Sequence, residues 1–354
     1  MKTPQHHPLS NSRTCQVFKY IIVVSLFLLF FGKGGVCLSS DQSPAKMHHL
    51  KVLVLPHVAF LPLTIAQEEG FFSEQALTVD FVRLSRSADA IPALSQGTLD
   101  VWAGTTSFSL FNAIARGARI KVVADKGYIA TGGCDDSAMM ARKDWVKDVK
   151  SPNAELLRGR TMALNPVSLP GFLIEKLLGT FALTLDDVQV VNLSDAAKIE
   201  AFGSGRIDFA YANEPWVTRM SQGGYAVPWV PLSNIAPDFQ QAFLCYGPNL
   251  LDQNPEVGRR FMVAYCKAVL KYNEGKTERN LDILAKHTDL EVDLLRQACW
   301  NPFRRGGHIN AQSLVEFQEW GRKKGFLDTT ATEDQFWDPH FVDYANKILS
   351  GASK

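Results

Sequence analysis

The sequence predicts an α/β protein built from two lobes. Its 354 residues exceed what a single small core usually holds. An order of strand, helix, strand, helix and strand occurs twice, with the two copies offset by about 108 residues. A repeat of this kind is typical of two packed α/β units. The composition, 46% apolar and 21% charged, is ordinary for a folded globular chain.

Each copy is defined by short apolar runs and by proline and glycine boundaries. The first copy predicts strands at 51–55, 77–84 and 99–103, with helices from Pro62 to Gly70 and from about Asp89 to Gly97. The second predicts strands at 161–164, 188–193 and 207–211, with helices from Pro170 and from about Ala196 to Gly203. A signature of glycine, any residue, an apolar residue, aspartate and an apolar residue stands at 97–101 and again at 205–209.

The remainder of the chain predicts mainly helices that pack back onto a lobe. Asn254, Pro255 and Glu256 form a favourable helix start, and further helices are expected at 289–300 and 311–324. We therefore expect the first lobe at 48–143, the second at 144–239, and a return to the first lobe over 240–354.

The first residues have the order of a secretory signal peptide. Basic residues come first, the apolar run 21–31 follows with only Ser25 to interrupt it, and small residues come next. We expect residues 1–38 to be removed on export, which predicts a periplasmic or secreted protein. Eleven helical residues rise about 16 Å, short of the roughly 30 Å of a hydrocarbon core. A lipid on Cys37 is the alternative form of this segment.

Charge and missing motifs exclude several classes of function. Lys and Arg number 37 and Asp and Glu 36, and four of the basic residues precede position 38. The slightly acidic remainder has no basic run, so we expect no nucleic-acid partner. Phosphate-binding, dinucleotide-binding, hydrolase-elbow and metal-ligand motifs are missing from the sequence. We expect no catalytic residues, no cofactor and no metal.

A ligand site is expected where the strands of both lobes end. Ligands of open α/β sheets bind beyond the carboxyl ends of the strands, where helix N-termini gather. The loops at these ends supply the candidate ligand-binding residues His57, Phe60, Ser85, Thr105, Thr106, Ser107, Tyr128, Asn165, Ser168, Asn213, Glu214 and Trp216.

Two of these loops suggest opposite ligand chemistry. The hydroxyls of Thr105, Thr106 and Ser107 precede a helix, which suits an oxyanion, although the same residues also serve as ordinary helix caps. Glu214 suits an ammonium or aminopyrimidine donor, unless it binds backbone or a basic side chain. We favour the amine or pyrimidine slightly. Phe60 and Trp216 could stack on a ring or simply form the cleft wall.

The mature chain would keep four cysteines. Cys134, Cys245, Cys266 and Cys299 allow three complete disulfide pairings, and their spacing does not choose among them. Cys266 and Cys299 lie in helix-like, partly apolar stretches, so we expect four free thiols.

The pattern resembles the solute-binding proteins of ABC importers for nitrate, sulfonates, taurine and thiamine-pyrimidine precursors. The resemblance is carried by PLTIAQEEGFFSEQALTVDFV (62–82), DAIPALSQGTLDV (89–101), LRGRTMALN (157–165), ANEPW (212–216) and DQNPEVGRRFMVAYCKAV (252–269). It implies a type II periplasmic-binding-protein fold with a ligand cleft between the lobes.

The resemblance also implies partners. These are a small-molecule ligand, of sulfonate-like or thiamine-pyrimidine-like chemistry, and an ABC permease with its ATPase, and we expect a monomer. One alternative is an enzyme similar to the fungal thiamine-pyrimidine synthase, whose Cys-rich loop is replaced here by a stretch with Cys245 alone. The other is a ligand-sensing module for a membrane receptor.

Overall fold

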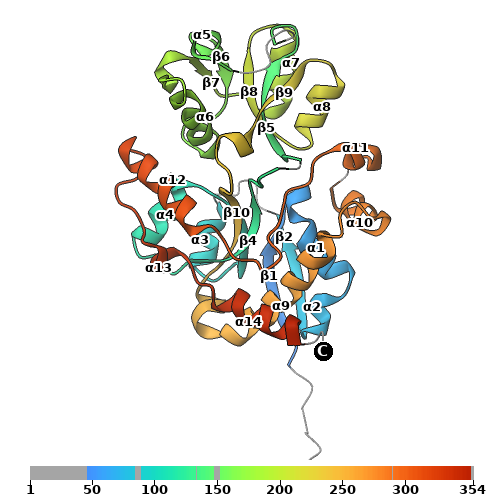
Figure 1. Ribbon diagram of the computed structural model, residues 1–354. Helices are drawn as coiled ribbons and strands as arrows, with labels where there is room; N and C mark the ends of the chain where they lie inside the picture. The colour runs from blue at the N-terminus through green and yellow to red at the C-terminus, as the bar shows by residue number, and fades with distance from the viewer. Residues whose placement is uncertain (1–45, 84–88, 133, 147–151, 289, 352–354) are drawn as a thin grey trace, which may run out of the picture. The chain divides into compact units, whose positions relative to one another are not determined.

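The computed structural model describes residues 46–83, 89–132, 134–146, 152–288 and 290–351 (Figure 1). The expected signal peptide, with Cys37, lies outside the described residues, as does Ser85. No helix in the described ranges has both the length and the apolar character that a membrane crossing requires.

The first sheet has five strands in the order β2-β1-β3-β10-β4. β1, β2 and β3 are parallel, whereas β10 is antiparallel to both of its neighbours. Its strands are β1 (His48–Leu53), β2 (Leu77–Val82), β3 (Val101–Thr105), β4 (Lys121–Tyr128) and β10 (Gln240–Tyr246).

The second sheet repeats this topology in the order β7-β6-β8-β5-β9. Its strands are β5 (Ser137–Arg142), β6 (Thr161–Ala163), β7 (Gln189–Val191), β8 (Phe209–Asn213) and β9 (Ala226–Pro231). β5 is antiparallel to β8 and β9, in the position that β10 occupies in the first sheet. The expected lobe boundary at 143/144 is therefore too late, because β5 already pairs within the second sheet.

The repeated glycine–aspartate signature has the same structural role in both lobes. Gly97 and Gly205 follow helices with φ of +71° and +69°, a conformation that favours glycine. Asp100 then accepts a 2.7 Å hydrogen bond from the backbone N–H of Lys51, and Asp208 a 3.1 Å bond from that of Thr161. These carboxylates fix the start of β3 beside β1 and the start of β8 beside β6. Both strands consequently begin two residues later than predicted.

Helices cover both faces of each sheet (Figure 1). One face of the first sheet packs against α3 (Ala90–Ser95), α4 (Phe108–Ala115), α12 (Ala311–Lys323) and α13 (Glu333–Phe336). The other packs against α1 (Leu61–Glu68), α2 (Phe71–Glu74), α9 (Pro255–Tyr272), α10 (Glu278–Thr288) and α14 (His340–Gly351). In the second lobe α5 (Ala154–Leu157) and α6 (Leu169–Gly179) cover one face, and α7 (Asp195–Gly203) and α8 (Trp216–Gln222) the other.

The helix expected at 289–300 is shorter than predicted. α11 spans Val292–Gln297, and the chain is extended from Ala298. The backbone N–H of Cys299 is bound by Glu214 of the second lobe, so this stretch leaves the helix to make a contact between lobes.

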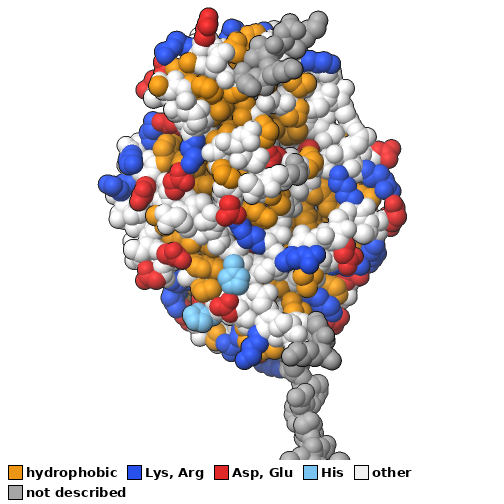
Figure 2. Space-filling model, in the orientation of Figure 1, with side chains coloured by type: hydrophobic (Ala, Val, Ile, Leu, Met, Phe, Trp, Pro, Cys, Tyr) orange, Lys and Arg blue, Asp and Glu red, His pale blue; other side chains and the backbone are white. Residues whose placement is uncertain are grey.

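On the face shown in Figure 2, basic and acidic side chains are interspersed rather than gathered into a patch of one sign.

Candidate functional site

The candidate site is a cavity of about 870 Å³ lined by residues of both lobes. It lies where β1, β3 and β8 end and where β10 begins, as expected for an α/β sheet. Eight of the twelve predicted site residues line it: His57, Phe60, Thr105, Thr106, Ser107, Asn165, Ser168 and Asn213.

The hydroxyl groups of the first lobe are only partly available to a ligand. Thr106 Oγ1 donates to the carbonyl oxygen of Gln240 at 2.8 Å, so its proton is already used within the sheet. Ser107 Oγ lies 3.2 Å from Ser109 Oγ and makes no helix-capping bond. Thr105 is exposed to the cavity. The predicted oxyanion role is therefore contradicted for Thr106 as a donor and stays a prediction for Thr105 and Ser107.

The second-lobe residues mainly fix their own loop. Asn165 Oδ1 accepts from the backbone N–H of Val167 at 3.0 Å, and Ser168 Oγ donates to the carbonyl of Asn165 at 2.6 Å. These bonds hold the turn that leads into α6. Asn213 ends β8 beside the cavity, where it pairs with Ser137 of β5.

Glu214 does not line the cavity, and this corrects the prediction of an amine-binding carboxylate. Its side chain is buried, and both oxygens are occupied. Oε2 accepts from the backbone N–H of Thr218 at 3.0 Å, and Oε1 from the Thr218 hydroxyl at 2.9 Å and from the N–H of Cys299 at 3.0 Å. The carboxylate therefore fastens the first turn of α8 to the segment after α11.

We expect Glu214→Gln to lower the free energy of unfolding by about 2–3 kcal/mol, because an amide NH₂ would face hydrogen-bond donors that the carboxylate now satisfies. Glu200→Gln, an exposed change on α7, is the matched control. Chemical denaturation of both variants measures the difference. If the Glu214→Gln and Glu200→Gln variants were equally stable, Glu214 would not stabilise the contact between α8 and the segment after α11.

Tyr128 and Trp216 also lie away from the cavity. Gly127 has a φ of +138° at a register shift between β4 and β10, which breaks the strand alternation and turns Tyr128 away. The Tyr128 ring instead packs under the Arg304 guanidinium at 3.7 Å. Trp216 packs on the face of the second sheet that α7 and α8 cover, with the Arg219 guanidinium 5.0 Å from the centre of its ring. Stacking of a ligand on Trp216 is therefore contradicted.

Five polar residues that the sequence analysis missed line the cavity: Ser109, Lys126, Asp136, Gln241 and Asn301. Lys126 lies within β4, two residues before the predicted site residue Tyr128. Gln241 lies at the amino end of an antiparallel strand, which the carboxyl-end rule does not cover. Asp136 and Asn301 meet only through the fold, where the Asn301 amide donates to Asp136 Oδ2.

Burial shifts the pKa values of four ionisable groups in this wall, and it raises the pKa of the Tyr211 phenol. Desolvation lowers the pKa of His57 to about 4, with a further lowering by Lys126, so the imidazole is neutral at pH 7. Desolvation also lowers the pKa of the Lys126 ammonium to about 8, although Asp125 and Asp136 oppose this shift. The pKa of Asp136 is raised to about 7, again mainly by burial.

A disulfide joins Cys134 to Cys299, which corrects the expectation of four free thiols. Cys134 lies in the crossover between β4 and β5, and Cys299 follows α11. The partners are 165 residues apart in sequence, so only the tertiary structure reveals the pairing. Cys245 and Cys266 are free and buried, and burial raises the pKa of both thiols.

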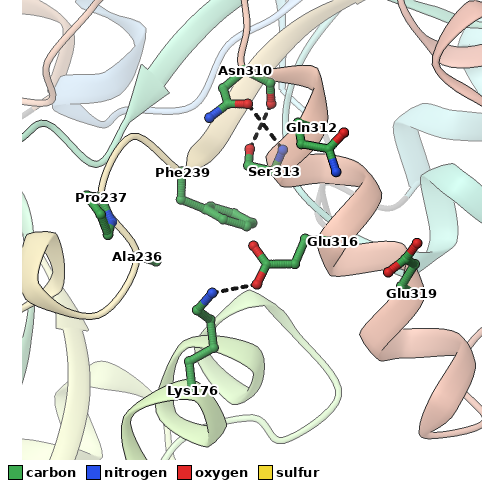
Figure 3. A pocket seen from close by; sticks show the side chains of 9 residues that line it. All are labelled: Lys176, Ala236, Pro237, Phe239, Asn310, Gln312, Ser313, Glu316 and Glu319. Atoms are coloured by element: carbon green, nitrogen blue, oxygen red, sulfur yellow. Dashed lines mark hydrogen bonds and ion pairs between the residues drawn. The ribbon is translucent and has the colours of Figure 1, made fainter. Parts of the chain in front are cut away.

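A second hollow, of about 370 Å³, lies between α6, the crossover before β10 and α12 (Figure 3). Lys176 of α6 forms an ion pair with Glu316 of α12, and the Asn310 side chain caps α12 through the Ser313 N–H. Its central charged groups are thus already paired. The described residues contain no cluster of side chains that could hold a metal ion.

Comparison with known proteins gives one family and many structural matches. A family model described as NMT1/THI5 like matches residues 57–273. No curated protein was found to match the sequence significantly.

Three solved structures illustrate the structural similarity. The ligand-binding component of an ABC-type import system from Staphylococcus aureus is 18% identical, with 84% of this chain and 99% of that chain covered and a TM-score of 0.67. The alkanesulfonate-binding protein SsuA from Xanthomonas axonopodis pv. citri, bound to MOPS, is 16% identical, with 83% and 98% covered and a TM-score of 0.62. The desulfurization enzyme DSZB is 16% identical, with 85% and 99% covered and a TM-score of 0.64. The predicted two-lobed fold is confirmed.

Proposed function

The chain belongs to the NMT1/THI5-like family, and from this premise we propose that it is the extracytoplasmic solute-binding subunit of an ABC importer. In this role it captures one small organic solute between its lobes and delivers it to a permease with its ATPase. The fold it shares with ABC-import binding proteins supports the proposal.

The observation that carries the proposal is the cavity lined by both lobes. Most of the exposed area of its wall is apolar, with contributions from Phe60, Phe108, Leu169 and Tyr211, although about half of the lining residues are polar. This combination is typical of a site for a small organic molecule. Because residues of both sheets line the same space, a solute there would contact the two lobes at once and favour their closure.

Export is supported by two features. The expected signal peptide would send the chain out of the cytoplasm, and the Cys134–Cys299 disulfide is of a kind that persists in oxidising compartments. Free release after cleavage fits these features, and anchoring through Cys37 is the alternative.

An enzyme similar to the desulfurization enzyme is the competing function, and the cavity wall disfavours thiol chemistry. Among the described residues, no cysteine lines the cavity. Burial raises the pKa of Cys266 to about 12, and that of Cys245 is raised as well, so neither is a thiolate at neutral pH. A sensing module would use the same cavity. Loss of solute uptake on deletion of the gene would separate import from sensing.

The proposal predicts a thermal shift with the right solute. At 100 times its dissociation constant, a solute stabilises the folded chain by about 2.7 kcal/mol, which raises the melting temperature by several degrees. The panel to screen contains taurine, alkyl and aryl sulfonates, carboxylates, nitrate and aminopyrimidines. Thr105→Trp should abolish the shift by filling the cavity mouth, whereas Thr78→Trp on β2, away from the cavity, should keep it. A panel that shifts neither the wild type nor Thr78→Trp would count against the proposal.

A further inference from the structure

Lys126 presents a buried ammonium group to the cavity without a partner. Its side chain is 2% exposed and lines the cavity from β4. Within the described ranges its Nζ makes no hydrogen bond and no ion pair, and it lies 4.2 Å from the centre of the Phe60 ring. Lys198 is also buried, but its ammonium group has hydrogen-bond partners. Lys198 Nζ donates to Asp195 Oδ1 and to the Tyr211 carbonyl, both at 2.7 Å.

Gln241 is a second unpartnered polar group on the same wall. It is 7% exposed, and its buried Oε1 has no hydrogen-bond partner. In the preceding residue, Gln240, both ends of the side-chain amide have hydrogen-bond partners. Its Nε2 donates to Asp125 Oδ1 at 2.6 Å and to the Ala242 carbonyl at 2.7 Å, and its Oε1 accepts from Arg304 at 2.9 Å. Because buried polar groups are nearly always satisfied, two open ones on one cavity wall indicate that a bound molecule satisfies them.

The sheet order places these groups together. β10 lies between β3 and β4, so Gln241, Thr105 and Lys126 come from three adjacent strands at the same edge of the sheet. The Lys126 ammonium group, the unpartnered Oε1 of Gln241 and the exposed hydroxyl of Thr105 therefore line the same part of the cavity. The apolar wall described above surrounds the rest.

The other charges near Lys126 are already engaged. On its own strand, Asp125 is bound by Gln240, by the N–H of Gly127 at 3.1 Å and by the N–H of Arg304 at 2.8 Å. From the crossover, Asp136 accepts from Asn301, and its burial favours the protonated form. From the loop after β1, His57 is neutral at pH 7. The unsatisfied charge at this end of the cavity is thus positive.

Resting on the proposed solute-binding function, we propose that Lys126 is the charge-recognising residue and that the solute is an organic anion with an apolar body. A carboxylate or sulfonate group pairs with Lys126, the unpartnered Oε1 of Gln241 accepts a hydrogen bond from an N–H or O–H group of the solute, and the apolar wall holds the rest. An ion pair in such a desolvated site is a charge-assisted hydrogen bond of the stronger class.

Calorimetric titration of the full chain tests this with matched pairs: benzoate against benzamide, and benzenesulfonate against benzenesulfonamide, or the best acid from the thermal screen against its amide. The wild type should bind the acid more tightly than its neutral amide. Lys126→Met should weaken binding of the acid roughly 10- to 150-fold and leave the amide nearly unchanged. Gln241→Leu should weaken the amide, whose N–H can donate to Gln241 Oε1, and leave the acid, which has no donor for this oxygen, nearly unchanged. Lys143→Met, an equal charge change at an exposed position that does not line the cavity, should change neither.

Two results would overturn the inference: a folded Lys126→Met variant that binds the acid within twofold of the wild type, or a wild type that prefers the neutral or a cationic analogue. These differ from failure of the proposed function. If no solute binds at all, the solute-binding role fails. If neutral or cationic solutes bind in a manner that Thr105→Trp abolishes, the role stands and only the assignment of Lys126 fails.

Discussion

Replacing Cys134 and Cys299 together with serine is expected to lower the free energy of unfolding by roughly 4–5 kcal/mol. The disulfide closes a loop between residues 165 apart in sequence, and cross-links across long loops remove the most conformational entropy from the unfolded chain. It also ties the crossover between the sheets to the segment in which Glu214 binds the N–H of Cys299. Loss of the disulfide should therefore destabilise both lobes.

Urea denaturation of the double variant and of the wild type, each with and without reductant, measures this contribution. Reductant should bring the wild type close to the variant and leave the variant unchanged, because Cys245 and Cys266 are free thiols in the native protein. A variant as stable as the oxidised wild type would mean that the disulfide adds nothing to the fold.

Lys126→Met is expected to raise the stability of the ligand-free protein by about 3 kcal/mol at pH 7. Burial lowers the pKa of Lys126 from 10.5 to about 8, so folding with the ammonium charged costs free energy at neutral pH. Methionine fills a similar volume without a charge. A residue that weakens the empty protein and strengthens the solute complex is characteristic of a binding site rather than of the core.

The pH dependence provides the control. Between about pH 8 and 10.5 the unfolded wild type holds the Lys126 proton and the folded form releases it, so wild-type stability should rise with pH through this window. The difference in unfolding free energy between Lys126→Met and the wild type should be largest below pH 8 and should disappear as the pH approaches 10.5. Lys143→Met should run parallel to the wild type throughout. A destabilised Lys126→Met variant would show that the ammonium is satisfied in the empty cavity.

Local sequence patterns predicted the repeated architecture and eight of the residues that line the candidate cavity. Strand and helix periods, and glycine and aspartate at a spacing of 108, are local features, and the structure confirms two sheets of matching topology. The loops at the carboxyl ends of parallel strands follow from the same local pattern. His57, Thr105, Asn165 and Asn213 were found in this way, and all line the cavity.

Long-range contacts contribute to the chemistry of the cavity. Whether Glu214 or Lys126 faces a solute depends on which of them other residues satisfy. Thr218, four residues further along, supplies two of the three hydrogen bonds to Glu214, and a distant residue supplies the third. Glu214 is occupied by the N–H of Cys299, 85 residues further along the chain, whereas no described residue pairs with Lys126. The antiparallel strand that brings in Gln241 and the Cys134–Cys299 disulfide are likewise long-range features. Local patterns report burial and turns, but the pairing of buried polar groups depends on contacts that only the folded chain makes.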